Sequence, residues 1–364
     1  MKRGTIGRVQ RALASVEARI FLVSLAVHLL FQVPLNAAMP FAYYSELSEG
    51  DARAYFPISL HPFPAQPAFS PNKYRRIVLP LLARMFPGER HLAFLIVGVV
   101  AASLAAVFFY RIARGSSAHA RELTLLFAAV PYLFAGAHLG YTEPLMVAAL
   151  LAGYDSVNRG RLCLGTACFA FAMLSKEIAV FPVLALFVVS TIGREWRKAA
   201  HTVLALALPT VYYLAVGLRW GDVLWLLRGD VERANVGFTP WVIAQLLRAA
   251  PREPLPFLLA LDQMANIALL AVLILAIWKL AGQRHLFVYL ALSCVPLLFL
   301  GPAVVYYNWH VGRQALIAPL SLLGLDAVIP RLRPLLWLVL LLMLGMSVYQ
   351  SLFWAKFFWF HKLW

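Results

Sequence analysis

The stretch His91–Ala113, which reads HLAFLIVGVVAASLAAVFFYRIA, decides the fold class. Arg111 is its only Asp, Glu, Lys or Arg, and its length matches the roughly 20 residues that a helix needs to cross a bilayer. In hydrocarbon the backbone N–H and C=O groups must bond within their own segment, which a helix achieves. We therefore expect a transmembrane helix here.

Comparable apolar runs recur on both sides of this stretch. Hydrophobic residues make up 62% of the 364, and charged residues 13%. A soluble domain of this length would need a more charged surface. Some runs are shorter than a standard span, so we expect about ten or eleven transmembrane helices in one all-α polytopic domain, 1–364. The other runs are 20–38, 122–138, 142–157, 162–174, 177–193, 199–218, 264–281, 285–302, 312–328 and 333–353.

The distribution of cations predicts the orientation. The net charge of +16 does not indicate nucleic acid, because the cations lie in short loops between apolar runs. With the N-terminus inside, five short connections at 111–121, 158–161, 193–198, 279–285 and 330–334 carry 12 Lys and Arg. Cytoplasmic loops are enriched in such residues, so we predict a cytoplasmic N-terminus. The long connections, about 39–90 and 219–263, are then external.

Composition also suggests where the protein resides. The basic N-terminal segment leads straight into run 20–38 without a clear cleavage site, which favours an uncleaved first helix. High Ala, Leu and Arg use fits a bacterial inner membrane. Both long loops mix apolar, aromatic and charged residues at near-helical spacing, so we expect short amphipathic helices on the membrane surface, roofing a cavity on the external, periplasmic side. Membrane lipids are the implied surroundings.

Asp51 is the first candidate for chemistry. It lies in Gly50-Asp51-Ala52-Arg53-Ala54-Tyr55, shortly after the first run, so it should lie near the external surface. A carboxylate there could take a proton from a hydroxyl nucleophile. The alternative is a solvated aspartate or a helix cap, which spacing alone favours.

Arg75 and Arg76 follow in the same loop. Adjacent arginines at an interface can hold a lipid phosphate through charge-assisted hydrogen bonds. A snorkelling basic anchor is the alternative, although the external side is where topology disfavours Arg.

Polar and charged residues at the ends of two middle spans are further candidates. Tyr141 and Glu143 lie in Gly-Tyr-Thr-Glu-Pro at the start of run 142–157, where a carboxylate could simply complement the helix dipole. Lys176 and Glu177 interrupt an apolar stretch, so these two charges must either face water or pair within a cavity. The alternative to a functional role is a local ion pair. An ionisable group at a span mouth is a functional candidate by default.

The connection near 303–313 is rich in aromatic residues and also contains His310 and Arg313, three positions apart. Aromatic belts explain its Trp and Tyr but not these two. His61 is also external, yet no histidine pair has metal-ligand spacing, so we assign no metal site. The three cysteines read as small core residues. No nucleotide-binding loop, nucleophile elbow or metalloprotease motif is present.

Several of these segments together resemble the GT-C superfamily of membrane glycosyltransferases. They are the Asp in the first external loop, Tyr-Arg-Arg-x-x-Leu-Pro-Leu-Leu, Tyr-Thr-Glu-Pro at a mid-chain span, the charged turn after the next hairpin, and a late Gly-Arg-Gln. The Tyr-Thr-Glu element is similar to the PIG-V-like mannosyltransferases and their bacterial relatives. The resemblance covers most of the chain, although we expect no soluble C-terminal domain like that of the larger members.

The resemblance implies an inverting hexosyltransferase, in the nearest case a mannosyltransferase, that uses polyprenyl-phosphate sugars. The acceptor would be a lipid, a glycan or a protein of the cell envelope. Asp51 matches the general base, and Arg75, Arg76, Lys176 and Arg313 match positions that hold the donor phosphate. Substrate-binding candidates are Tyr55, His61, Tyr141, Glu143, Glu177 and His310. No cofactor is firmly implied; Gly50 stands where an acidic pair would be, which leaves a divalent cation open.

A transporter or lipid flippase is the main alternative. It would use similar intramembrane charges and a cationic cavity. Poor internal symmetry and the two long aromatic loops argue against it.

Overall fold

The computed structural model of the protein describes residues 15–38, 51–69, 71–223, 239–249, 257–300 and 314–346. These residues are predominantly helical, and no β-strand occurs among them. The α-helices are α2 (Val16–Ala38), α4 (Asp51–Leu60), α5 (Pro71–Arg75), α6 (Val78–Met85), α7 (Arg90–Ala113), α8 (Ala120–Ala128), α9 (Pro131–His138), α10 (Glu143–Asn158), α11 (Leu162–Ser175), α12 (Val180–Ile192), α13 (Trp196–Arg219), α14 (Thr239–Ala249), α15 (Phe257–Lys279), α16 (Arg284–Ser293) and α19 (Ile329–Leu332). Short 3₁₀ segments are η1 (Glu177–Ala179), η3 (Val295–Phe299), η4 (Pro319–Val328) and η5 (Arg333–Leu335).

Three helical segments in the described part are long and apolar enough to cross a membrane: α7, α13 and Pro319–Met346. A fourth crossing would need α8 and α9 together, which bend by 49° between them. Shorter apolar helices occupy Leu162–Ser175, Glu177–Ile192, Ile267–Lys279 and Arg284–Phe299. The all-helical class is thus confirmed, with helices of membrane-crossing length, while a count of ten or eleven crossings stays a prediction.

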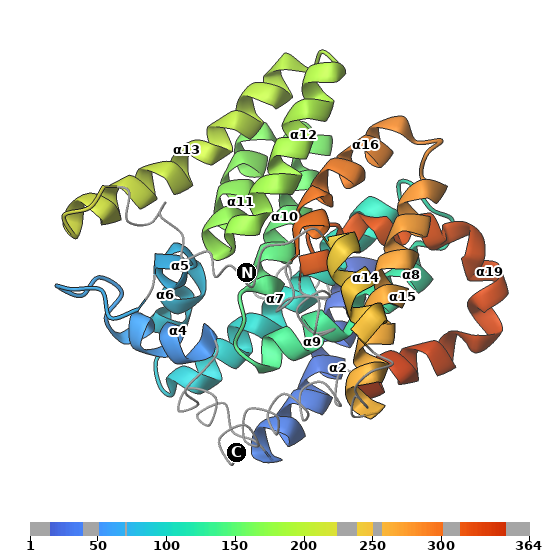
Figure 1. The fold of residues 1–364 in the computed structure, drawn as a ribbon, viewed down its shortest axis with the longest axis horizontal. Helices are drawn as coiled ribbons and strands as arrows, with labels where there is room; N and C mark the ends of the chain where they lie inside the picture. Colours follow the sequence, from blue (N-terminus) through green and yellow to red (C-terminus); the bar gives the residue numbers. More distant parts are fainter. Residues whose placement is uncertain are drawn as a thin grey trace, which may run out of the picture.

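Helix α7 lies at the centre of the fold (Figure 1). Most of its side chains are buried, and it packs against α2, α6, α8, α9 and α10. Small residues recur along it, which lets neighbouring backbones approach closely. Gly98 is one such position, because a Cβ added there would lie 3.0 Å from the Ala137 backbone of α9. The apolar run that decides the fold class therefore becomes a buried helix that the others surround.

The α10–α11 hairpin is the most closely packed helix pair near the candidate residues. A Cβ added at Gly153 would lie 2.5 Å from the Phe169 ring, closer than side chains approach. Glycine is needed here so that α11 can lie directly against α10, as in small-residue packing between membrane helices. The hairpin carries Glu143 at one end of α10 and Lys176 just after the end of α11.

The first long loop is folded beside the end of α13. Trp220 Nε1 donates to the Pro64 carbonyl at 3.1 Å, and the Tyr212 hydroxyl donates to the Tyr74 carbonyl at 2.8 Å. Helices α4, α5 and α6 form this region at the left of Figure 1. Helix α6 lies within the first long loop and α14 within the second, so both loops contain helices as expected. That these helices lie on a membrane surface stays a prediction.

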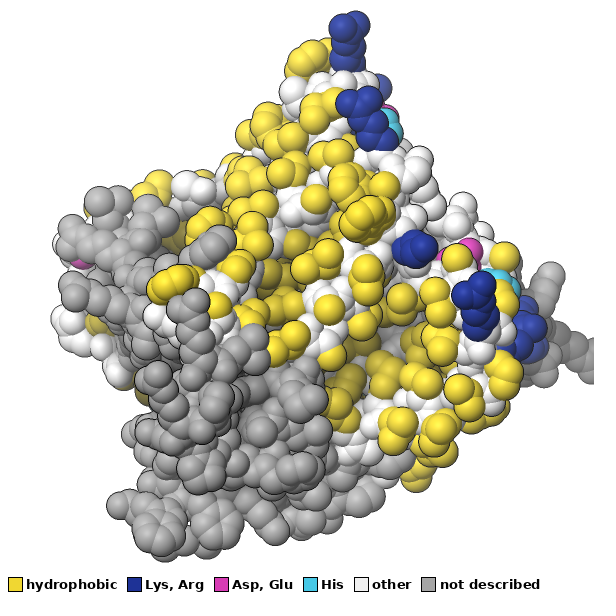
Figure 2. Space-filling view, turned by 45° about the vertical axis from the view of Figure 1, so that its right-hand side comes forward, with side chains coloured by type: hydrophobic (Ala, Val, Ile, Leu, Met, Phe, Trp, Pro, Cys, Tyr) yellow, Lys and Arg dark blue, Asp and Glu magenta, His cyan; other side chains and the backbone are white. Residues whose placement is uncertain are grey.

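One face of the molecule exposes a broad apolar surface (Figure 2). Large side chains such as Leu204, Leu208 and Val211 of α13 and Trp278 of α15 are exposed. Figure 2 shows Lys and Arg along the upper right edge of the described face, beyond this hydrophobic area. Such a large apolar patch on one chain suits contact with lipid or another apolar surface.

Candidate functional site

The turn between α9 and α10 positions Glu143. Gly140 has a φ of +65°, a left-handed conformation that glycine adopts without strain, and the Tyr141 N–H donates to the Gly136 carbonyl at 2.9 Å. The chain then enters α10 with Glu143 as its first residue and Pro144 as its second. The Glu143 side chain is fully buried as a result.

Lys176 approaches Glu143 from the other arm of the hairpin. Its Nζ lies 2.6 Å from Glu143 Oε1, and the two side chains are 3% and 0% exposed. An isolated charge at such a site would carry a large desolvation penalty, so each of these charges depends on the other. The pair therefore joins α10 to α11 at the end of the hairpin that lies away from its connecting turn.

Glu177, the next residue, pairs in another direction. Arg76 donates to it twice, from Nε to Oε2 at 2.9 Å and from Nη2 to Oε1 at 2.6 Å. This two-pronged geometry is the one that arginine makes best with a carboxylate. Lys176 and Glu177 thus engage Glu143 and Arg76 respectively, and their turn joins the hairpin to the first long loop.

Tyr55 of α4 contacts Arg76. Its side chain is fully buried, and Arg76 Nη1 lies 3.4 Å from its hydroxyl oxygen. Asp51 begins α4 four residues earlier, about 6 Å along the helix axis. The structure describes the backbone of Asp51 but not its side chain.

Within this cluster, Arg75 has spare hydrogen-bonding capacity. Its Nε is buried and has no hydrogen-bond partner among the described residues. Tyr213 of α13 lies near enough to interact electrostatically with Arg75, Arg76 and Glu177. Burial raises the pKa of the neighbouring Tyr74 hydroxyl, which also accepts a hydrogen bond from the Ala68 N–H. Among the described side chains of this cluster, Arg76 and Lys176 have carboxylate partners, and no ion pair joins Arg75 to a carboxylate.

The structure thus brings Tyr55, Arg76, Glu143, Lys176 and Glu177 into one chain of contacts. Arg75 precedes Arg76, and Tyr141 is buried in the turn before Glu143. His61 directly follows α4 at an exposed position, and among the described residues no hydrogen bond or ion pair joins its side chain to the cluster. His310 and Arg313 lie outside the described residues.

Sequence reasoning missed the contribution of α13. Tyr213 lies near the charged cluster, and Trp220 and Tyr212 fasten the loop that carries Arg75 and Arg76. The signal was the aromatic cluster at the end of run 199–218, which polar-residue motifs do not capture.

Within the described residues, no group of three or more His, Cys, Asp or Glu is arranged to hold a metal ion. Comparison of the chain with models of protein families, with curated proteins and with solved structures finds no match.

Proposed function

We propose that the protein is a membrane glycosyltransferase of the GT-C type, with about ten or eleven transmembrane helices. It transfers a sugar from a polyprenyl-phosphate donor to an acceptor at the external face. The observation that carries this proposal is the convergence of Arg75, Arg76 and the Lys176–Glu177 turn beside α4, which Asp51 begins. These segments are three of the five on which the resemblance to the superfamily rests.

The cluster has the electrostatics that a phosphate leaving group requires. Arg76 and Lys176 are already neutralised by carboxylates, so Arg75 is the cation most available to a bound anion. Fixed donors in a site with little water stabilise developing negative charge without reorganising. In this proposal Glu143 and Lys176 are positioning residues, and Tyr55 and Arg76 border the substrate.

A groove on the same helices suits the lipid part of such a donor. It has a volume of about 510 Å³ and is lined almost wholly by apolar side chains of α6, α7, α10 and α11. Leu82 of α6 and Phe86 directly after this helix contribute to the lining, and α6 begins two residues after Arg76 in the chain. A prenyl chain in this groove would leave its phosphate near the arginines.

The proposed reaction is a single displacement. Asp51 accepts the proton of the acceptor hydroxyl, whose oxygen bonds to the anomeric carbon as the bond from that carbon to the phosphate oxygen breaks. The electron pair leaves with the polyprenyl phosphate. Arg75 and Arg76 stabilise the negative charge of this leaving group. One displacement inverts the configuration at the sugar carbon.

The test is donor consumption by the full chain in liposomes. A panel of radiolabelled polyprenyl-phosphate sugars is supplied with membrane extract as the acceptor source. Asp51→Asn should lower release of polyprenyl phosphate on the order of 10²-fold or more, because general-base catalysis contributes that much. The matched control is Glu89→Gln, an exposed carboxylate of the same predicted loop, which should keep the parental rate.

Parental turnover by a folded Asp51→Asn protein would refute the assignment of the base. Movement of labelled lipid between leaflets without sugar release would support the flippase instead. Buried ion pairs in an apolar helical bundle are compatible with that function.

A further inference from the structure

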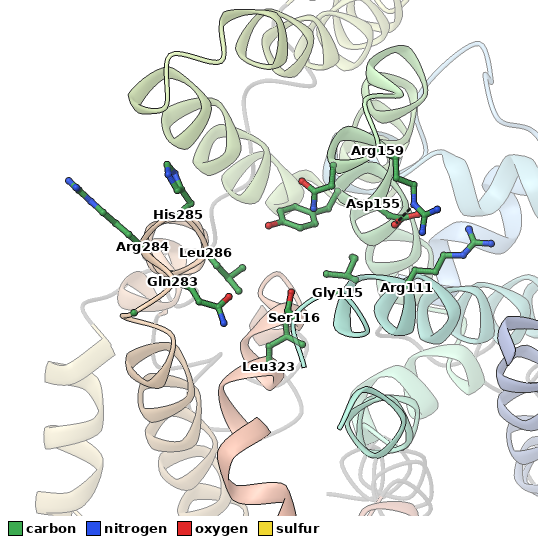
Figure 3. Close-up of a pocket in the computed structure, with 14 residues that line it drawn as sticks. Arg111, Gly115, Ser116, Asp155, Arg159, Gln283, Arg284, His285, Leu286 and Leu323 are labelled. Carbon is green, nitrogen blue, oxygen red and sulfur yellow. Dashed lines mark hydrogen bonds and ion pairs between the residues drawn. The ribbon is translucent and has the colours of Figure 1, made fainter. Parts of the chain in front are cut away.

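A second polar region lies outside the candidate site. It is a cavity of about 770 Å³ between the ends of α7 and α10, the α15–α16 connection and η4. We name it the Arg111 cavity, after the arginine on α7 that lines it. Figure 3 shows Arg111 and Arg159 on one side, with Gln283 and Arg284 on the other.

This cavity and the candidate site occupy opposite ends of the same helices. Glu143 begins α10, whereas Asp155 and Arg159 at its other end line the cavity. Asp155 lies twelve positions after Glu143, which is about 18 Å along the helix axis. Helix α7 likewise runs about 32 Å from Arg90, beside α6, to Arg111 at the cavity. The cavity therefore belongs to the end that the cation pattern predicts to be cytoplasmic.

Only some of the arginines around the cavity have a carboxylate partner among the described residues. Arg159 is held by Asp155 at 2.8 Å, which accounts for the single carboxylate of the lining. Arg111 stacks over the Phe108 ring at 5.5 Å, and its buried Nε has no hydrogen-bond partner among the described residues. Arg284 lies exposed on the opposite rim. Among the described residues, Arg111 and Arg284 are thus the arginines of the lining that have no carboxylate partner.

Neutral hydrogen-bonding groups line the space between these arginines. Ser116 and Gln283 lie between Arg111 and Arg284 in Figure 3, and Tyr154 and Asn158 also contribute to the lining. Such groups suit the hydroxyl or ester oxygens next to a phosphate. A volume of several hundred Å³ is typical of a small-molecule site.

We propose that the Arg111 cavity binds a phosphate-bearing polar group, with Arg111 as its principal cation. An anionic lipid of the cytoplasmic leaflet presents this chemistry as its headgroup, and a soluble phosphomonoester presents it free. The Arg111 cavity is separate from the site proposed for sugar transfer. The proposal of phosphate binding in the cavity therefore does not depend on the proposed glycosyltransferase activity.

The experiment measures thermal unfolding of the delipidated full chain in neutral detergent. One arm is titrated with phosphatidylglycerol, one with glycerol 3-phosphate and one with phosphatidylcholine. Native mass spectrometry counts the molecules retained. Phosphatidylglycerol should raise the unfolding midpoint and leave one retained molecule, and phosphatidylcholine should do neither. An equal effect of glycerol 3-phosphate, in competition with the lipid, would identify the free phosphate as sufficient.

Three variants locate the effect. Arg111→Gln should require about tenfold more phosphatidylglycerol for the same shift, because hydrogen bonds to charged groups contribute strongly. Gln283→Ala, which changes an exposed side chain, should require severalfold more. Arg197→Gln removes the same charge from an exposed position of the same predicted face and should change nothing.

Equal losses in Arg111→Gln and Arg197→Gln would mean diffuse surface attraction and would overturn the proposal. So would equal shifts with phosphatidylglycerol and phosphatidylcholine. If Arg111→Gln fails to fold, an unchanged response of Gln283→Ala to phosphatidylglycerol would be decisive against it.

Discussion

Arg76 and Glu177 lie 101 positions apart in the chain, yet two hydrogen bonds of 2.9 and 2.6 Å join their side chains. Their side chains are 12% and 33% exposed, so the pair is partly shielded from solvent. It connects the loop after α5 to the turn between α11 and α12. Through this contact the first long loop takes a fixed position against the α10–α11 hairpin.

A double-mutant cycle tests this connection. Arg76→Gln and Glu177→Gln should each lower the free energy of unfolding, and the double variant should lose less than the sum. A coupling of roughly 0.5–3 kcal/mol is expected for residues in direct contact. Thermal or denaturant unfolding in detergent provides the measurement, and strictly additive losses would argue that the pair does not form.

The Glu143–Lys176 pair should respond more severely, because it is almost completely buried. Lys176→Met alone leaves the Glu143 carboxylate without its cation and should cost roughly 3–5 kcal/mol of stability. Adding Glu143→Leu removes that charge and should recover much of the loss. Glu195→Gln, in the more exposed pair with Lys198, is the control and should have little effect. A double variant no more stable than Lys176→Met would contradict this account.

The hairpin that carries this pair depends on Gly153. Gly153→Leu places a side chain where the Phe169 ring lies and should cost roughly 1–3 kcal/mol through overpacking. Gly345→Ala is the control, because an added Cβ there meets nothing within 4 Å. The unfolding midpoints of the two variants make the comparison, and an undisturbed Gly153→Leu protein would show that α11 can move away.

Helix positions were predictable from the sequence because hydrophobic runs and charged breaks identify them directly. Run 91–113 became α7 within one residue at its start, and the Lys176–Glu177 break separates two helices as expected. Run 122–138 instead bends between α8 and α9, where Pro131 begins the second helix. Proline lacks a backbone donor and interrupts a helix, so that bend follows from local chemistry.

Pairing across the cluster could not be predicted in the same way. Lys176 and Glu177 are neighbours, and a local ion pair between them was a reasonable alternative. The structure instead pairs Lys176 with Glu143 and Glu177 with Arg76. Which partner each charge takes depends on how closely α10 and α11 pack, and that distance is set by tertiary contacts at Gly153 and Phe169.

Arg75 provides the most direct test of how the proposed site would use its positive charge. Its buried Nε has no hydrogen-bond partner in the described part of the chain, unlike Arg76, which is occupied by Glu177. Arg75→Gln should therefore raise the KM for a polyprenyl-phosphate sugar by about tenfold, since it removes a charge-assisted hydrogen bond to the donor. Arg75→Lys should recover part of that loss, because it restores the charge without the planar geometry of the guanidinium.

Arg84→Gln is the matched control, because Arg84 lies exposed on the adjacent helix α6 and donates only weakly, at 3.3 Å, to the Leu60 carbonyl. Steady-state release of polyprenyl phosphate at increasing donor concentration separates KM from kcat for all three variants. A rise in KM for Arg75→Gln alone supports donor binding at Arg75. Equal KM values for Arg75→Gln and Arg84→Gln would move the phosphate away from Arg75, because both variants lose one positive charge from the same loop and only one of them loses a buried donor.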